Sequence, residues 1–416
     1  MIIIFKYTNL ILLLTAFTVK ADLYAFNSKD NQAFINGRVV DERKFPVPYA
    51  KVIVGNTEVL TDRQGKFVMT NVNTPYDLTV AEKTSSTAVI YKGLTITNPE
   101  IVLFGDLENR YSNYVSVIFS FPKIPEGGSA VAKLVSQEIF ECKEVNALAG
   151  DSTAVLNFIW PASENYLKGQ IVFILKDENG FQNIKFTDVT VNKNDIKKKV
   201  RITGKKGGTL KTSAVNVYLP SEKSLRNEFD ASLNFFNYSS NSQIIFSEYK
   251  SDKQKIQVRV PDDLPITSKI LLTDYGTYDN NSGYISYNYV SPGADVKLYT
   301  ESPPELFTPS DNYLGTTENT NFTYSLGSGT GIYVLEFKSN NPYIRLYIVT
   351  SERQSRLSYL SRSEFYNFSY EFTWSVRKYI TYFNTDEFVR PVFFKNNFSY
   401  RAVLYSNKRK FKTGYY

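Results

Sequence analysis

Three short motifs contain residues that could carry out serine acyl transfer. Ser247 and Lys250 have the Ser-x-x-Lys spacing, and an SDN motif at 310–312 and a KTG motif at 412–414 follow in chain order. In this chemistry a serine hydroxyl attacks a carbonyl, and a lysine three residues later helps to remove the hydroxyl proton. The geometry requires both residues on one face of a helix, where residues three apart are neighbours.

The sequence around the serine argues against this activity. The apolar run IIF directly before Ser247 favours a strand. Side chains alternate along a strand, so Ser247 and Lys250 would lie on opposite faces. Only two residues follow the KTG motif, which would need a central strand with structure on both sides. We therefore predict a protein that is not an enzyme and keep serine acyl transfer through Ser247 and Lys250 as a remote alternative.

The composition excludes other common active sites. The 416 residues include no histidine and one cysteine, Cys142. Ser-His-Asp and Cys-His catalysis are therefore excluded, and so is the commonest ligand of zinc and copper. We predict no metal and no cofactor. A single cysteine cannot form an internal disulfide, and Cys142 is expected to be a small buried residue.

The N-terminus predicts export. Residues 1–21 combine Lys6, a short apolar run from Leu10 to Phe17, and the sequence VKA before Asp22, which is typical of a signal peptide. The apolar run is too short to cross a bilayer, and no later stretch is long enough for a transmembrane helix. The net charge is +7. Export makes nucleic acid a poor match for this charge, and we expect the periplasm, the outer cell surface or the extracellular space.

A tyrosine-rich run is the candidate ligand-binding element. It reads YGTYDNNSGYISYNYV and contains Tyr275, Tyr278, Tyr284, Tyr287 and Tyr289. A row of exposed rings beside Asp279 and Asn280 would stack against sugars or peptides. In the alternative, one face of the run packs in a core and Asn281 to Gly283 forms a turn. The sequence leaves both interpretations open.

The rest of the chain has the rhythm of short strands. Aromatic residues make up 15% of the sequence, and apolar and polar residues alternate in short runs between turn signals. Residues 372–376 are one such run, with Trp374 as a predicted core residue. The segment from Lys133 to Asn146 is the best candidate for a helix, with a strand and loop as the alternative. The basic stretch from Lys197 to Lys206 lacks the P-loop spacing and is expected to be a solvated edge and linker.

The first 70 residues after the linker have the most specific pattern. Gly37-x-Val39 begins it, and the motifs Thr61-Asp62 and Gly65-x-Phe67 follow a strand. Asp62 is expected to bond the backbone of its turn, and Gly65 to adopt a positive φ. Calcium binding at Asp62 is the weaker interpretation, because this cation requires six to eight oxygens.

In this order and spacing, residues 35–105 resemble the carboxypeptidase regulatory-like domain, a transthyretin-like (prealbumin-like) sandwich. The sequence departs from that family at Tyr49, where the family usually has glycine. The resemblance implies a fold of about seven strands and a non-catalytic accessory role in exported bacterial proteins. More weakly, residues 309–389 resemble the fibronectin type III-like or immunoglobulin-like modules of bacterial surface proteins.

These observations predict an all-β protein of tandem β-sandwich domains. The expected division is a signal peptide (1–21), a linker (22–34), the carboxypeptidase regulatory-like sandwich (35–105), two further sandwiches (106–206 and 207–303), and a fibronectin- or immunoglobulin-like domain with C-terminal strands (304–416).

The expected function is binding, adhesion or an accessory role at a bacterial surface or in the periplasm, with a polysaccharide, a peptide or another surface protein as partner. An outer-membrane-associated β protein is the alternative.

Overall fold

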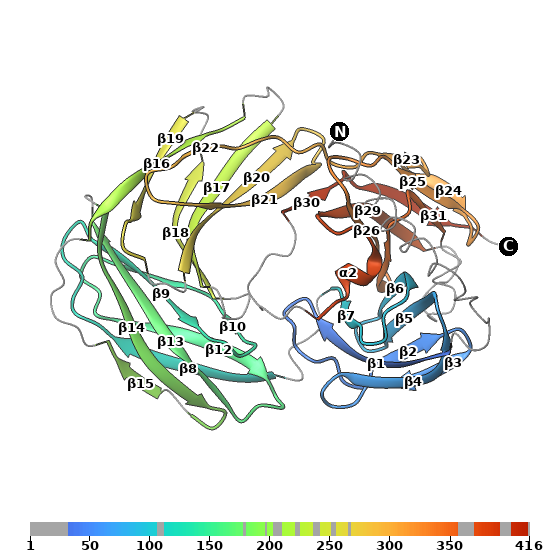
Figure 1. The fold of residues 1–416 in the computed structure, drawn as a ribbon, viewed down its shortest axis with the longest axis horizontal. Coiled ribbons are helices and arrows are strands. Elements are labelled where there is room, and N and C mark those ends of the chain that lie inside the picture. The colour runs from blue at the N-terminus through green and yellow to red at the C-terminus, as the bar shows by residue number, and fades with distance from the viewer. Residues whose placement is uncertain are drawn as a thin grey trace, which may run out of the picture.

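A computed structural model describes most of the chain. The described residues are 32–105, 112–177, 180–195, 198–202, 210–220, 225–235, 242–250, 255–264, 268–356, 370–391 and 401–414. The predicted signal peptide and most of the predicted linker lie outside these ranges, as does half of the basic stretch at 197–206. The described residues are almost entirely strands, which form four β-sandwiches arranged around a ring (Figure 1).

The first sandwich shows the alternation expected from its sequence. Its strands are β1 (Gln32–Asp41), β2 (Lys51–Val54), β3 (Thr57–Leu60), β4 (Lys66–Asn73), β5 (Tyr76–Glu82), β6 (Thr87–Leu94) and β7 (Glu100–Leu103). They form the sheets β4-β1-β7 and β3-β2-β5-β6. Phe67 and Met69 are buried between the sheets, whereas Val68 is 48% exposed. Period-two patterning therefore placed these side chains correctly.

The turn between β3 and β4 has the structure that its residues predict. Asp62 Oδ1 accepts hydrogen bonds from the backbone N–H groups of Gln64 and Lys66, each at 2.8 Å. Gly65 has a φ of 74°, and a Cβ there would lie 2.3 Å from the Val39 carbonyl oxygen. Tyr49, at the position where the resembling family has glycine, adopts a φ of 60°. The backbone thus keeps the left-handed conformation that glycine favours, although a tyrosine occupies the position.

The second sandwich contains the segment from Lys133 to Asn146, for which the sequence predicts either a helix or a strand with a loop. Its strands are β8 (Ser112–Ser120), β9 (Ser129–Val135), β10 (Glu141–Cys142), β11 (Val145–Leu148), β12 (Thr153–Pro161), β13 (Tyr166–Asp177), β14 (Gly180–Asn192) and β15 (Lys198–Arg201). They form the sheets β10-β12-β8-β15 and β11-β9-β13-β14. Of the two alternatives for Lys133 to Asn146, the helix is wrong and the strand with a loop is right, because β9, β10 and β11 occupy this segment with short connections between them. Cys142 is buried, as predicted.

The third sandwich contains the tyrosine-rich run. Its strands are β16 (Thr212–Tyr218), β17 (Leu225–Phe235), β18 (Gln243–Lys250), β19 (Lys255–Pro261), β20 (Ser268–Tyr278), β21 (Gly283–Val290) and β22 (Asp295–Lys297). One layer is β19-β16-β22, and the other is β18-β17-β20-β21. The first layer lies on the outside of the ring, so the free face of the second is directed toward the middle of the ring (Figure 1).

The fourth sandwich has an aromatic core. Its elements are β23 (Leu306–Thr308), β24 (Tyr313–Thr316), β25 (Asn321–Tyr324), β26 (Gly331–Asn340), β27 (Tyr343–Thr350), β28 (Gln354–Arg356), β29 (Glu371–Ile380), the short helix α2 (Thr385–Phe388), β30 (Ala402–Tyr405) and β31 (Arg409–Thr413). Trp374 is fully buried, and its ring centroid lies 5.0 Å from that of Phe322. The prediction of Trp374 as a core residue is confirmed.

One sheet passes through three of the four sandwiches. It contains 14 strands and runs from β18 in the third sandwich, through the fourth, to β3 in the first. β21 pairs with β30 at one junction. At the other, β27 pairs in parallel with β6, with Arg345 opposite Thr87 and Val349 opposite Tyr91. The first and last sandwiches are therefore joined by a backbone ladder between segments about 260 residues apart.

The strands at this second junction are buried on both faces. Val89 and Tyr91 of β6 pack in the core of the first sandwich, whereas Ala88 and Ile90 pack in the core of the fourth. The β27 sequence YIRLYIVT is a nearly continuous apolar run for the same reason. Two-sided burial is typical of parallel strands, and strands buried on both faces have nearly continuous apolar sequences.

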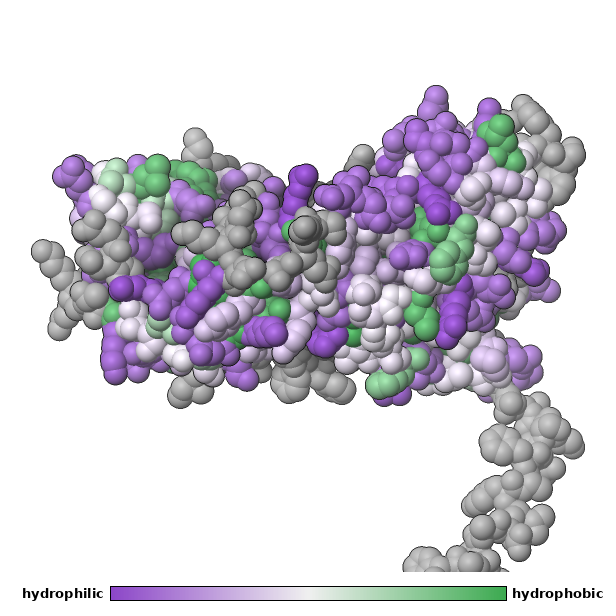
Figure 2. Space-filling view, turned by 90° about the horizontal axis from the view of Figure 1, so that it is seen from above, coloured by the Kyte–Doolittle hydropathy of each residue, from purple (hydrophilic) through white to green (hydrophobic). Residues whose placement is uncertain are grey.

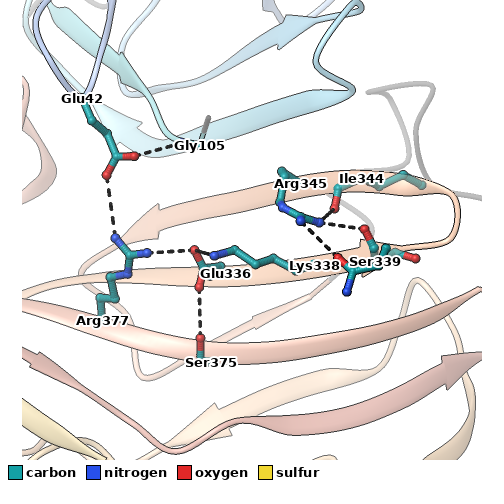
Figure 3. Close-up of polar contacts among 10 residues, drawn as sticks. Glu42, Gly105, Glu336, Lys338, Ser339, Ile344, Arg345, Ser375 and Arg377 are labelled. Atoms are coloured by element: carbon teal, nitrogen blue, oxygen red, sulfur yellow. Dashed lines mark hydrogen bonds and ion pairs between the residues drawn. The ribbon is translucent and has the colours of Figure 1, made fainter. Parts of the chain in front are cut away.

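Buried charges reinforce this junction (Figure 3). The Glu336 side chain is only 5% exposed, and its Oε1 lies 3.0 Å from Arg377 and 2.8 Å from Lys338. Burial alone would raise the pKa of Glu336, but the charge of Arg377 and the bond from Lys338 outweigh burial and lower it. Arg377 also lies 3.7 Å from Glu42, which accepts a bond from the Gly105 N–H. The network connects the first and fourth sandwiches.

The second sandwich completes the ring through side chains. Arg43 of the first sandwich forms an ion pair of 3.2 Å with Glu141 of the second. On the other side, Lys133 donates to the Gln243 carbonyl at 2.6 Å, and the Ile245 N–H donates to Glu144 at 3.0 Å. These bonds reach the backbone of β18, the edge strand of the long sheet. They satisfy groups that would otherwise be available for pairing with another chain.

The surface along the edge of the ring that lies at the top of Figure 1 is mainly polar. Apolar side chains appear there in small, separate patches (Figure 2). Within the described residues, no helix has the length and apolar character needed to cross a membrane.

Candidate functional site

The hairpin of β20 and β21 divides the five predicted tyrosines between two faces of one sheet. Thr277 pairs with Gly283, and this register continues to Ile270 and Val290. Paired residues share a face, and residues two apart along a strand also share it. Two groups result: one contains Tyr275, Tyr287 and Tyr289, and the other contains Tyr278 and Tyr284.

The second group belongs to the protein interior. Tyr284 is fully buried, and its ring covers Gly276, where a Cβ would lie 2.2 Å from a ring carbon. Only glycine fits opposite this ring. Tyr278 packs beside the small cluster that contains Tyr284, and Asn281 completes the turn with a φ of 62°. For these two tyrosines the core alternative describes the structure.

A buried carboxyl group lies next to Tyr284. Asp274 is fully buried on β20, facing Phe229 of β17 and Ser286 of β21. Neither carboxyl oxygen has a hydrogen-bond partner among the described residues. Burial raises the pKa of Asp274 to about 7, and the nearby Tyr284 hydroxyl only partly opposes this increase. Asp274 is therefore uncharged in acidic solution and partly charged at neutral pH.

The other face, called the tyrosine face below, carries polar groups beside its rings. One row across the four strands contains, in order, Glu248, Asp230, Thr273 and Tyr287. In the next row, Glu228 is opposite Tyr275. Burial raises the pKa of Asp230, the Tyr275 hydroxyl bond lowers it, and the charges of Glu248 and Glu228 raise it further. The carboxylates are thus close enough to repel one another.

The far end of the tyrosine face is formed by Tyr289. Its ring is 41% exposed, and its hydroxyl accepts a bond of 3.4 Å from Asn234. The Lys269 ammonium lies 5.9 Å from the ring centroid, within cation–π range. Ser232 accepts a bond of 2.8 Å from Gln243 in the same part of the sheet. The tyrosine face therefore combines aromatic rings with carboxylate, amide and hydroxyl groups.

The serine motif has the geometry that its sequence predicted. Ser247 and Lys250 both lie on strand β18, as the apolar run before Ser247 predicts, and not on the helix that the motif requires. The SDN and KTG motifs lie next to each other in the fourth sandwich, where β24 pairs with β31. β17, β20 and β21 separate β18 from that sandwich. The three motifs do not form one site.

The acidic side chains and the cysteine of the described residues are dispersed. This part of the chain contains no group of three or more cysteine, aspartate or glutamate side chains placed to hold an ion. The Asp62 oxygen considered for calcium instead accepts two backbone bonds in its turn.

A simple signal in the sequence predicts the split of the tyrosines. Tyr287 and Tyr289 are two apart on one strand, whereas Tyr284 is three residues before Tyr287. Alternation alone therefore places Tyr284 on the face opposite Tyr287. Treating the run as one row of rings missed this. The acids on β17 and β18 are distant in sequence, and only strand pairing brings them to the same face.

Comparison with known proteins gives no family. No family model matches the chain, and no curated protein matches it. Among solved structures, the Bacillus anthracis TIE protein is 10% identical over 65% of this chain, with a TM-score of 0.16. The matched part of this chain spans half the length of that protein.

Two further structures have similar scores. The major pilin subunit BcpA of Bacillus cereus is 10% identical, with 65% of this chain and 99% of the pilin covered and a TM-score of 0.14. The N-terminal four Ig domains of Dscam1 isoform 4.44 are 10% identical, with coverage of 92% and 99% and a TM-score of 0.15. Scores this low do not define the fold of this chain, which is defined by its own strands and their registers.

Proposed function

We propose that this chain is an exported, non-catalytic binding or adhesion protein of a bacterial surface or periplasm, and that its tyrosine face is the binding site. A polysaccharide or a peptide is the proposed ligand class. The observation that carries the proposal is the position of Tyr275, Tyr287 and Tyr289 on a sheet face outside the sandwich core, next to carboxylate and amide groups. Rings offer apolar area with a polar tip, and neighbouring polar groups supply orientation.

The scaffold supports this role. Recognition requires side chains held on rigid elements, and the tyrosine face lies on four paired strands of the long sheet. That sheet is tied to its neighbours by backbone ladders at two junctions. The ring therefore holds the tyrosine face at a fixed orientation relative to the other sandwiches.

We further propose that residues 35–105 form a carboxypeptidase regulatory-like domain and that residues 309–389 form an immunoglobulin-like or fibronectin type III-like module. The Asp62–Gly65 turn and the two sheets of the first sandwich support the first assignment. In that assignment the first sandwich is an accessory to binding. The division at 106–206, 207–303 and 304–416 remains part of the same proposal.

The test is binding of the full exported chain to glycan and peptide arrays, with tyrosine variants. Replacing Tyr275, Tyr287 and Tyr289 together by alanine should reduce binding of the best array ligand at least tenfold. Tyr114 is 60% exposed on β8, outside the tyrosine face. Tyr114→Ala is therefore the matched control and should leave binding unchanged.

Equal loss of binding in the control, or no loss in the triple variant, contradicts the assignment of the site. Circular dichroism of each variant separates loss of ligand contacts from loss of the fold.

A further inference from the structure

The first and fourth sandwiches are in direct contact, although they lie at opposite ends of the described chain. The chain enters the first sandwich at β1 and leaves the fourth after β31. β6 of the first and β27 of the fourth pair in parallel. Residues 112–297, which form the second and third sandwiches, therefore lie in a closed loop whose two ends are held together at this junction (Figure 1).

The two sandwiches share their cores across the junction. Five side chains of the fourth sandwich are buried in the core of the first, namely Ile332, Val334, Tyr347, Val349 and Val389. In the other direction, the core of the fourth contains three side chains of the first, namely Ala81, Ala88 and Ile90. Separating these sandwiches would therefore break a backbone ladder and bring apolar side chains of both cores into water, which is unfavourable.

The segment after β29 makes a second attachment between the same two sandwiches. The Glu100 N–H donates to the Val389 carbonyl at 2.7 Å. Asp386 of α2 accepts a hydrogen bond of 2.8 Å from the Thr95 N–H and another from the Thr95 hydroxyl. The junction thus combines a ladder, a shared core and polar contacts at more than one place.

The joint between the first and second sandwiches is different in kind. Among the described residues, no strand of the first sandwich pairs with a strand of the second. Arg43 and Glu141 connect them by an ion pair of 3.2 Å, and these side chains are 25% and 34% exposed. An ion pair that water reaches contributes little stability. The junction that closes the ring is therefore held by stronger interactions than this joint.

We propose that the junction between the first and fourth sandwiches is a mechanical latch. While the latch holds, these two sandwiches cannot move apart, so tension between the two ends of the chain does not stretch residues 112–297. The second and third sandwiches carry load only after the latch opens. The tyrosine face belongs to the third sandwich and keeps its geometry under tension for the same reason. This inference goes beyond the proposed function and requires no ligand.

The single cysteine of the chain reports whether the second sandwich carries load. Cys142 is buried on β10, and burial raises the pKa of its thiol to about 11. A buried, protonated thiol is unreactive. A fluorescent maleimide therefore labels Cys142 only when the second sandwich unfolds.

The test holds the full chain at constant force between handles attached before β1 and after β31. The latch variant is Glu42→Gln with Asp386→Asn, which removes the partner of Arg377 and the acceptor of the Thr95 bonds. Forced unfolding follows the unfolding rate of the element that carries the load. Cys142 should therefore be labelled at least fivefold faster in the latch variant than in the parent under tension.

A matched control variant removes the same two charges away from the junction. Glu58→Gln with Asp279→Asn changes exposed positions in the first and third sandwiches. This variant should leave the labelling rate under tension unchanged. Without tension, Cys142 should stay unlabelled in all three chains, and thermal melting of each variant confirms that it folds.

A second cysteine position gives the order of events. The chain with Ile90→Cys and Cys142→Ala carries its thiol on β6, where Ile90 is 2% exposed in the core of the fourth sandwich. Under increasing force, position 90 should be labelled before position 142 is labelled in the parent. Labelling of Cys142 at the same force or earlier overturns the latch. So does an equal labelling rate of Cys142 under tension in the parent and the latch variant.

Discussion

The two faces of the sheet β18-β17-β20-β21 use the same residue types for different purposes. On the core face, Tyr284 fills the space above Gly276, and Asp274 is buried with its pKa raised to about 7. On the tyrosine face, Tyr289 is partly exposed and Asp230 lies among other carboxylates. A tyrosine or an aspartate thus acquires its role from the side of the strand it occupies. Substitutions of matched residues on the two faces test this difference directly.

The largest expected effect is on the core face. Tyr284→Ala would leave a cavity above Gly276, because the three atoms nearest to a Cβ at that position all belong to the Tyr284 ring. Replacement of a fully buried aromatic residue by alanine costs about 3–5 kcal/mol. We expect a decrease of this size in the free energy of unfolding of the third sandwich, measured by urea denaturation. A decrease below about 1 kcal/mol would contradict the assignment of Tyr284 to the core.

The second effect depends on pH. The pKa of Asp274 rises from 3.8 to about 7 on folding, so the folded state holds a proton that the unfolded state loses above pH 4. The stability that Asp274 contributes is therefore fully present below about pH 4 and is lost as the pH rises through 7. A shift of about three units corresponds to on the order of 4 kcal/mol.

Asp274→Asn isolates this effect, because the amide keeps the shape of the side chain without its charge. We expect the variant to be more stable than the parent at pH 8 and similar to it at pH 4, as measured by urea denaturation at both values. A stability difference that does not change with pH would contradict the role of Asp274. Asp230→Asn, on the tyrosine face, provides the comparison.

The smallest expected effect on stability is on the tyrosine face. Tyr289→Ala removes a partly exposed ring and one hydrogen bond of 3.4 Å to Asn234. We expect a loss of at most about 1 kcal/mol, since a typical hydrogen bond contributes about 0.5–1.5 kcal/mol and little apolar area is lost. The same change should weaken ligand binding. A large loss of stability would instead make Tyr289 a structural residue.

Local features were predictable from the sequence where the residues of a single strand or a single turn determine the conformation and burial. Trp374, the Asp62–Gly65 turn and the alternation around Val68 all follow from neighbouring residues. The sequence left a helix and a strand with a loop open for Lys133 to Asn146, and the ambiguity has a physical reason. β9 is buried on both faces: Leu134 packs inside the second sandwich and Val135 packs against the third. A strand with two buried faces loses its alternating pattern and resembles a buried helix in sequence.

The sequence by itself determined that this chain forms short strands in an all-β fold, and alternation contained the split between Tyr284 and Tyr287. Only the tertiary structure decided that the free face of β18-β17-β20-β21 is directed toward the middle of the ring. The same holds for the pairing of Asp230 with Glu248 and of β6 with β27. These relations depend on pairing between segments far apart in the chain. The alternation of residues along a strand determines which side chains share a face. The pairing of distant strands determines which other residues lie beside that face.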